Sequence, residues 1–149
     1  MRIAVASDER THLTDAMIEE LERRGHQVER GGALLGEATD WPQVGQWVAE
    51  QVASGRSDEG IVFCWTGTGV SIAANKVPSI RAALCPDAET ARGARLWNNA
   101  NVLALSLRLT SEALAKEILE AWLATPWVEG EDAALVAQLG QIEKKYGPA

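Results

Sequence analysis

Cysteine and histidine are scarce in this chain, with two of each among 149 residues. A structural zinc site, which is built from four such ligands, would need every one of them, so none is expected. Two cysteines also cannot form the dense disulfide framework of a small secreted scaffold, which favours a reducing compartment, with the cytoplasm as the default. No long apolar run is present, and the opening MRIAVAS is too short for the apolar region of a signal peptide.

Basic residues are outnumbered as well. Lys and Arg total 14 against 21 Asp and Glu, which gives a formal net charge of −7 and a pI near 4.8. Nucleic acid and anionic membranes bind basic surfaces, so this balance argues against both as partners. The length and the 46% hydrophobic content are those of one soluble globular domain, which we expect to span residues 1–149.

Short apolar runs alternate with longer amphipathic stretches along the chain. Five runs have the length and composition of strands, at residues 2–7, 27–30, 60–64, 81–84 and 101–106. Apolar residues recur at helical spacing at about 11–24, 40–55, 70–75, 86–98, 110–125 and 131–146. This alternation is typical of an α/β protein with a parallel sheet.

Polar and reactive residues follow the carboxyl ends of several predicted strands, where open parallel sheets bind ligands. The third strand ends at Cys64 and leads into a loop of small residues, Thr66, Gly67, Thr68 and Gly69. Such a loop at a helix N-terminus turns backbone N–H groups toward one point, where they can hold a phosphate or a reaction oxyanion and favour a thiolate. The loop alone also fits a tight structural turn, and Cys64 alone also fits a small core side chain.

Several segments carry a family resemblance. They are CWTGTGVSIAANK (64–76), IRAALC (80–85), NNANVLALSLR (98–108), the opening RIAVASD (2–8) and TDWP (39–42). Over essentially its whole length the sequence resembles the ribose-5-phosphate isomerase B and galactose-6-phosphate isomerase family. The resemblance implies a Rossmann-like, doubly wound α/β/α sandwich with a five-stranded parallel sheet and an extra C-terminal helix. It also implies a homodimer, or a dimer of dimers, with active sites between subunits, and aldose–ketose isomerisation of a sugar through a cis-enediolate without metal or cofactor.

The resemblance also implies roles for individual residues. Cys64 matches the cysteine that moves the proton, and Thr66 matches the hydroxyl beside it. The N–H groups of the loop Gly67–Gly69 match those that hold the enediolate. Asp8 matches an acidic residue that contacts the sugar hydroxyls, and Asn98 matches an active-site asparagine.

Four positions lack a histidine or an arginine of the family pattern. Glu9 stands where the family has a histidine, and Trp97 replaces its ring-opening histidine. Glu131 and Leu135 stand where two arginines grip the substrate phosphate. Each change has a structural explanation too: for example, Glu131 can favour its helix N-terminus, and Leu135 can pack in the core.

These departures remove positive charge from the predicted site. Arginine pairs usually grip a phosphate. At an effective dielectric near 20, by contrast, two like charges about 4 Å apart cost on the order of 4 kcal/mol, which is roughly a thousandfold in affinity. The sequence therefore predicts a sugar isomerase for an unphosphorylated or atypical substrate. Two alternatives stay open: a sugar-phosphate isomerase whose phosphate site has moved to Arg10 or Arg92, and a sugar-binding homologue without activity.

Two tryptophans also stand at the predicted site. Trp65 lies in the loop where the family usually has glycine, and Trp97 is the second. Indoles near one cleft can cover the apolar C–H face of a neutral sugar, or they can pack at a subunit interface, where tryptophan is enriched. Both interpretations stay open, whereas the other cysteine, Cys85, is interpreted as a core side chain.

Overall fold

The computed structural model describes residues 1–148. Its strands are β1 (Arg2–Ser7), β2 (Gln27–Gly32), β3 (Glu59–Cys64), β4 (Ala82–Leu84) and β5 (Val102–Ser106). Its helices are α1 (His12–Arg23), α2 (Trp41–Ala53), α3 (Thr68–Asn75), α4 (Ala88–Asn98), α5 (Glu112–Leu123) and α6 (Ala133–Tyr146), with a short 3₁₀ turn, η1 (Ala33–Leu35), after β2. Each strand and helix expected from the sequence is present, with its bounds shifted by at most two residues. Across residues 1–148, no helix combines the length and the apolar content that crossing a membrane requires.

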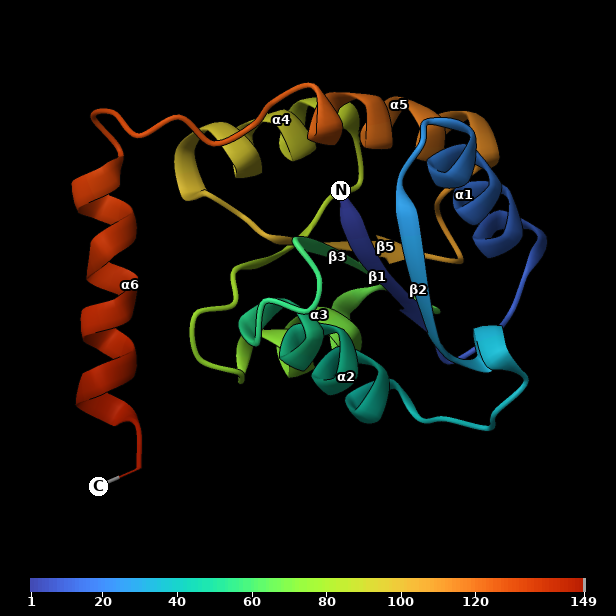
Figure 1. Cartoon of the computed structure of the whole chain (residues 1–149), viewed down its shortest axis with the longest axis horizontal. Helices are drawn as coiled ribbons and strands as arrows, with labels where there is room; N and C mark the ends of the chain where they lie inside the picture. The colour runs from blue at the N-terminus through green and yellow to red at the C-terminus, as the bar shows by residue number, and fades with distance from the viewer. Residues whose placement is uncertain (149) are drawn as a thin grey trace.

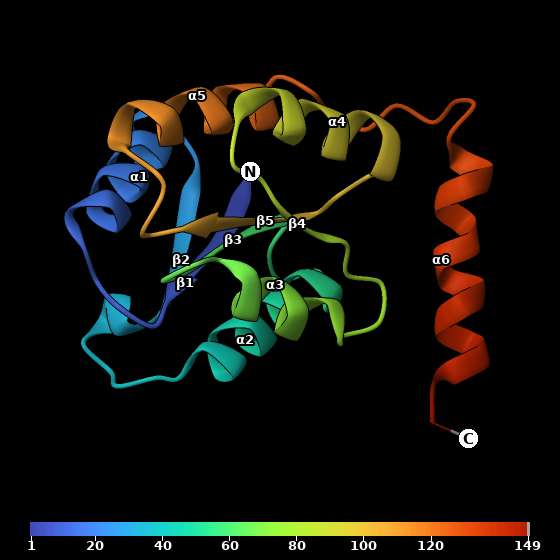
Figure 2. The same ribbon diagram turned by 180° about the vertical axis from the view of Figure 1, so that it is seen from behind.

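The strands form one parallel sheet in the order β2-β1-β3-β5-β4 (Figures 1 and 2). The chain moves from β1 outward to β2, then returns past β1 to β3 and continues to the other edge. The direction of winding therefore reverses between β1 and β3. Doubly wound sheets bind ligands at such a reversal, beyond the carboxyl ends of the strands. The doubly wound α/β/α sandwich implied by the resemblance is confirmed.

Helices cover both faces of the sheet (Figure 1). The helices α1, α4 and α5 lie over one face, and α2 and α3 lie over the other. Side chains of β3 alternate between the two cores: Phe63 belongs to the core beneath α1, α4 and α5, whereas Val62 and Cys64 belong to the core beneath α2 and α3. Because both faces are covered, β3 and β5 are buried along their whole length.

Short polar side chains fix where helices begin. The Thr90 N–H donates to the Asp87 carboxylate at 2.7 Å, and the Leu114 N–H donates to the Ser111 hydroxyl at 3.1 Å. Both acceptors have extended backbone and precede the first helical turn, as N-caps do. The helix predicted from residue 86 therefore begins only at Ala88, after its cap.

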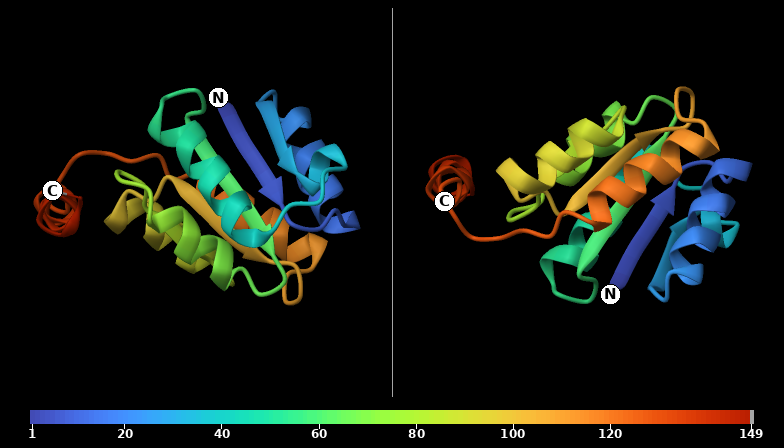
Figure 3. Two further views of the ribbon diagram at one scale, coloured as in Figure 1. Left: turned by 90° about the horizontal axis from the view of Figure 1, so that it is seen from below. Right: turned by 90° about the horizontal axis from the view of Figure 1, so that it is seen from above.

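The C-terminal helix α6 stands apart from the sandwich (Figures 1 and 3). None of its residues is buried, and the α6 stripe, which consists of Leu135, Leu139, Ile142 and Tyr146, is 42–76% exposed. A contact with the sandwich runs from the Ser79 N–H to the Glu143 carboxylate at 2.9 Å. The apolar stripe expected from the sequence is present but is not packed into a core: Leu139 and Ile142 line an open cavity between α6 and the sandwich. Leu135 is 61% exposed, so its interpretation as a core residue is wrong for a single chain.

A buried ionic cluster lies at the amino edge of the sheet, where the strands begin. Arg95 of α4 is 7% exposed and pairs with the Glu59 carboxylate of β3 at 2.7 Å. It also donates to the carbonyl oxygens of Thr125 and Ala100. The other Glu59 oxygen accepts the Trp122 indole N–H at 2.6 Å. This cluster joins β3, α4 and the end of α5.

Candidate active site

Asp8 and Cys64 meet at the reversal between β1 and β3. The strand register pairs Ser7, the last residue of β1, with Phe63, the residue before Cys64, so Asp8 and Cys64 both lie at the carboxyl ends of these neighbouring strands. Adjacent strands lie about 4.8 Å apart, and the Cys64 side chain belongs to the core beneath α2 and α3. Cys64 is 5% exposed in the single chain, and Asp8 is partly exposed.

Gly67 allows the loop after Cys64 to turn directly into α3. It is the N-cap of the helix with φ of +76°, a left-handed conformation that side chains disfavour. A Cβ at this position would lie 2.6 Å from Leu84 Cδ1 and 2.9 Å from the Leu105 carbonyl carbon. A glycine is therefore needed both for its backbone conformation and for the space it leaves.

The start of α3 offers hydrogen-bond donors at this edge of the sheet. The first N–H groups of a helix, here those of Thr68 and Gly69, have no acceptor within the helix. They lie at the positive end of the helix dipole, which favours a negative charge nearby. The Thr66 and Thr68 hydroxyl groups lie 2.7 Å apart and form a hydrogen bond. The arrangement can bind an oxyanion and supplies a hydroxyl group beside it.

The turn after β5 holds the loop in place. The Cys64 carbonyl accepts the Leu107 N–H at 3.0 Å, and the Trp65 carbonyl accepts the Arg108 N–H at 2.9 Å. The Ser106 hydroxyl also donates to the Trp65 carbonyl at 2.9 Å. The backbone of the loop is thus fixed, while the Trp65 side chain stays 60% exposed at the edge of the sheet.

The N-terminus of α2 also reaches this site. A Cβ at Gly69 would lie 2.8 Å from Cε3 of Trp41, so the indole rests directly on the Gly69 backbone. Trp41 is 45% exposed. Burial raises the pKa of Asp8 above its ordinary value, and the charges of Glu9 and Asp40 raise it further, against the opposing effect of a backbone hydrogen bond.

Asp40 and Trp41 were not identified as site residues from the sequence. Asp40 is the N-cap of α2, and its N–H donates to the Gln43 side chain at 3.3 Å. The signal that could have found Trp41 is Gly69, since a glycine in a first helical turn leaves room for a ring from another element. Sequence alone does not say which ring fills that room.

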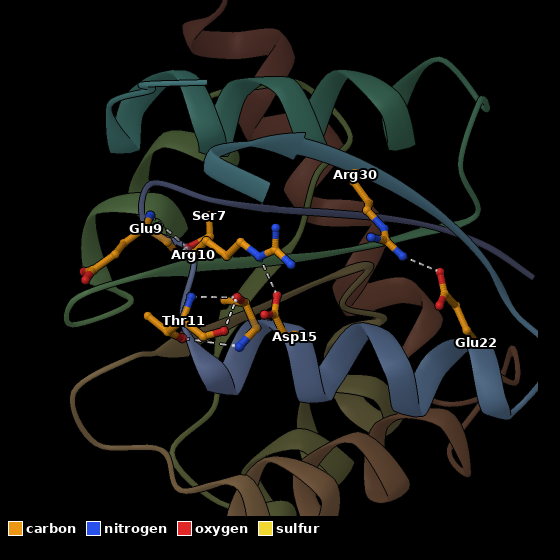
Figure 4. A network of polar contacts seen from close by, with 8 residues as sticks. Ser7, Glu9, Arg10, Thr11, Asp15, Glu22 and Arg30 are labelled. Carbon is orange, nitrogen blue, oxygen red and sulfur yellow. Dashed lines mark hydrogen bonds and ion pairs between the residues drawn. The ribbon is translucent and has the colours of Figure 1, made fainter. Parts of the chain in front are cut away.

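Glu9 follows Asp8 but is held by its backbone. The Ser7 hydroxyl donates to the Glu9 carbonyl at 2.5 Å and accepts the Glu9 N–H at 3.2 Å (Figure 4). The Glu9 side chain itself is exposed. It adds a negative charge next to Asp8.

The two arginines considered for a relocated phosphate site both have carboxylate partners. Arg10 bonds Asp15 at 2.8 Å (Figure 4), and Arg92 bonds Glu89 at 2.7 Å within α4. Arg108 differs, because its backbone is joined to the loop, its side chain is exposed, and no carboxylate within residues 1–148 pairs with it. Arg108 is therefore the cation best placed beside the loop.

Trp97 and Asn98 lie at the opposite edge of the sheet. The helix α4 runs back from the carboxyl end of β4, so its last residues reach the amino edge, where Asn98 lines a cavity with Arg81 and Glu143. The Trp97 ring lies against Gly93 of its own helix. The expectation that Trp65 and Trp97 share one cleft is therefore wrong within a single chain. Only a second copy could bring Trp97 or Asn98 to Cys64.

Glu131 also lies away from the loop, just before α6 begins at Ala133. Cys85, in contrast, has the predicted core position. It is 1% exposed, and burial raises the pKa of its thiol to about 12, with a smaller contribution from Asp87. Such a thiol stays protonated at neutral pH, which leaves Cys64 as the cysteine available for acid–base chemistry.

The doubly wound sheet, with a glycine loop and a helix N-terminus at its reversal point, defines a Rossmann-like α/β domain with a ligand site at the carboxyl edge. The model of the Ribose/Galactose Isomerase family matches residues 3–139. The chain belongs to this family and is an aldose–ketose isomerase.

Relatives cover the chain almost completely. The putative sugar phosphate isomerase YwlF of Bacillus subtilis is 35% identical over 147 residues, which are 97% of this chain and 99% of the relative. Ribose-5-phosphate isomerase B of Escherichia coli is 38% identical over 133 residues, 89% of each chain. D-erythrulose-4-phosphate isomerase of Pectobacterium atrosepticum is 37% identical over 145 residues, which are 96% of this chain and 95% of the relative.

Solved structures show the same fold. Ribose-5-phosphate isomerase B of Clostridium thermocellum has a TM-score of 0.93 and 44% identity, covering 99% of this chain and 100% of the other. The Mycoplasma genitalium ribose-5-phosphate isomerase B, solved with bound ribulose-5-phosphate, has a TM-score of 0.88 and 33% identity, covering 97% of each chain.

Proposed function

We propose that this isomerase acts on an unphosphorylated sugar or another small hydroxy-carbonyl compound, with Cys64 as the base. The observation that carries the proposal is that Cys64 and Asp8 lie at the ends of neighbouring strands at the reversal of the sheet, where the first N–H groups of α3 have no acceptor within the helix. A thiol, a carboxylate and an oxyanion-binding helix end supply the groups that enediolate chemistry requires.

In the proposed reaction, the Cys64 thiolate removes the proton from the carbon beside the carbonyl group. The electrons of that C–H bond form the carbon–carbon double bond, and the carbonyl oxygen becomes an oxyanion bound by the N–H groups of Gly67–Gly69. Thr66 passes a proton between the two enediolate oxygens, and Cys64 returns its proton to the former carbonyl carbon. The product has the same atoms and electrons as the substrate. Asp8 orients the sugar hydroxyls, and Asp8 or Glu9 opens the ring of a cyclic substrate.

The charges around Cys64 support a neutral substrate. Burial raises the pKa of Asp8, and the charges of Glu9 and Asp40 raise it further, so both carboxylates act on Asp8 at this edge. A dianionic phosphate group brought among three carboxylates would be repelled. The exposed Trp41 and Trp65 rings offer apolar faces that suit the C–H face of a sugar.

We also propose a homodimer, or a dimer of such dimers, in which the active site is shared between copies. Two observations support it: the α6 stripe is uncovered in the single chain, and Trp97 and Asn98 lie far from the loop along the sheet. In a dimer, Asn98 of the second copy would orient the substrate over Cys64 of the first. The neighbouring Trp97 would then cover the same cleft.

A second candidate function is isomerisation of a sugar phosphate. It is favoured by Arg108, which has no carboxylate partner within the described residues and is joined through its backbone to the loop. The names of the relatives point the same way. Under this alternative, Arg108→Ala would abolish turnover of the phosphorylated substrate.

Isotope exchange tests the proposal. Neutral aldoses and ketoses are incubated with the protein in heavy water, and deuterium is measured on the carbon beside the carbonyl. Cys64→Ala should slow exchange by about a hundredfold to ten-thousandfold, the usual contribution of a general base. Val62→Ala is the matched control, because Val62 lies on the same face of β3 and its loss should reduce stability while leaving exchange nearly intact. Exchange that survives in Cys64→Ala would refute the role of Cys64.

A further inference from the structure

A small cavity lies next to the loop, beyond the carboxyl ends of β3, β4 and β5. Its volume is about 200 Å³. Its lining residues come from the loop and from the turns after β4 and β5: Thr66, Leu84, Cys85, Pro86, Ser106, Leu109 and Thr110. Charged side chains are missing from this lining. The walls are mainly apolar, with three hydroxyl-bearing residues among them.

The three hydroxyl groups differ in their partners. The Ser106 hydroxyl donates to the Trp65 carbonyl and accepts the Leu109 N–H at 3.1 Å. The Thr66 hydroxyl bonds that of Thr68. Thr110 is 8% exposed, yet its hydroxyl has no hydrogen-bond partner among residues 1–148, where the Thr110 N–H alone is bonded, to the Ser106 carbonyl. No buried side-chain oxygen or nitrogen among residues 1–148 lacks a partner, so the Thr110 hydroxyl is accessible to solvent. A hydroxyl that lines the cavity and has no protein partner can bond a water molecule or a ligand there.

Thr66 connects this cavity to the candidate active site, because it lines the cavity and its hydroxyl is bonded to that of Thr68 at the start of α3. We infer that the cavity binds the uncharged, non-reacting end of the sugar chain, with the Thr110 hydroxyl bonding a sugar hydroxyl. This inference rests on the proposed function for the position of the reacting end. The apolar walls then pack against the C–H groups of the sugar.

The size and the polarity of the cavity fit such a ligand. A volume of 200 Å³ holds about six or seven water-sized groups, since each takes about 30 Å³. This is enough for one end of a sugar chain. A phosphate group would have to give up its hydration in a cavity without any cation, which is strongly unfavourable. The cavity therefore selects a hydroxyl-bearing end over a phosphorylated one.

Thr110→Val tests the inference, because valine keeps the shape of the side chain and removes its hydroxyl group. The KM for pentoses and hexoses should rise by about threefold to tenfold, as expected for one lost hydrogen bond. The KM for glyceraldehyde, whose chain ends before the cavity, should rise by a clearly smaller factor. Thr125→Val is the matched control, since the Thr125 hydroxyl bonds the Ala121 carbonyl at the far end of α5, and it should change neither KM. An equal change for all chain lengths, or no change, would overturn the inference.

Calorimetric binding of ribitol separates this inference from the proposed function. Ribitol has no carbonyl group and cannot be isomerised, so its binding does not depend on catalysis. Thr110→Val should weaken ribitol binding by threefold to tenfold, and ribitol 5-phosphate should bind the unmodified protein more weakly than ribitol does. Equal ribitol affinity in the variant, or tighter binding of the phosphate, would contradict the inference. If no sugar exchanges deuterium, the proposed function is wrong. The ribitol measurement still shows whether the cavity binds the end of a sugar chain.

Discussion

The two edges of the sheet use their polar groups differently. At the amino edge, Arg95, Glu59 and Trp122 bond one another in a buried cluster. At the carboxyl edge, the first N–H groups of α3 have no acceptor within the helix, and the thiol of Cys64 is free of any disulfide. The same sheet therefore carries a satisfied polar cluster at one end and donors without an acceptor in their own helix at the other.

This difference indicates that the buried ionic cluster is structural and that the groups around Cys64 are functional. A buried charge is tolerable when every hydrogen-bonding position around it is filled, as at the amino edge. Such a group has nothing left to offer a ligand. Free backbone donors at a helix end can instead bind a charge that appears during a reaction. Changes in the cluster of Arg95, Glu59 and Trp122 should therefore alter stability, and changes around Cys64 should alter activity.

The largest expected effect concerns the proposed sharing of the site between copies. Homodimers of Cys64→Ala and of Asn98→Ala should each be nearly inactive. When the two are unfolded together and refolded as a mixture, hybrid dimers with one intact site should restore about a quarter of the normal activity, as expected for a twofold symmetric dimer. Refolding each variant alone is the control. A mixture no more active than its parents would show that Asn98 does not act across the interface.

The next largest effect concerns the stability of the buried ionic cluster at the amino edge. Arg95→Ala should lower the free energy of unfolding by about 3–5 kcal/mol, because it leaves the Glu59 carboxylate buried without its cation. Burial already raises the pKa of Glu59, so this loss should shrink at acidic pH, where Glu59 becomes neutral.

Urea denaturation at neutral and at acidic pH measures both the loss of unfolding free energy in Arg95→Ala and its decrease with pH. The matched control is Arg2→Ala, which removes an exposed ion pair with Asp58 at the same edge and should cost at most about 1 kcal/mol. Similar small losses in the two variants would mean that the buried cluster is not a structural anchor.

The smallest effect concerns Asp8 and its pH dependence. The folded pKa of Asp8 lies above its unfolded value, mainly because of burial. The folded protein therefore favours the neutral form of Asp8. The contribution of this group to the free energy of unfolding is fully present below its unfolded pKa and is lost as pH rises through its folded pKa. Asp8→Asn should therefore melt at a slightly higher temperature than the unmodified protein at pH 7, while its activity falls. The gain in melting temperature should disappear below about pH 3.9, the ordinary carboxyl pKa, and a gain that persists there would exclude this origin.

Much of this architecture could be predicted from local sequence signals. The apolar strand that ends at Cys64 and the glycine at 67 identify the loop, because a left-handed backbone turn favours glycine over residues with a Cβ. Caps such as Ser111 mark helix starts through one side-chain hydrogen bond. These features depend on residues close together in the chain, so a pattern suffices to find them.

Other features depend on contacts between distant segments and could not be predicted in this way. The separation of Trp97 and Asn98 from Cys64 follows from the direction in which α4 crosses the sheet. The placement of Trp41 on Gly69 follows from the packing of α2 against α3. The exposure of the α6 stripe is likewise a property of the tertiary structure.

The most direct measurement of the central claim compares one sugar with its own phosphate ester. The kcat/KM for ribose and for ribose 5-phosphate is measured under the same conditions. If the carboxylates around Cys64 repel a phosphate group, ribose should be converted at least as efficiently as its phosphate. A preference for ribose 5-phosphate by about a thousandfold, the equivalent of roughly 4 kcal/mol, would contradict the account.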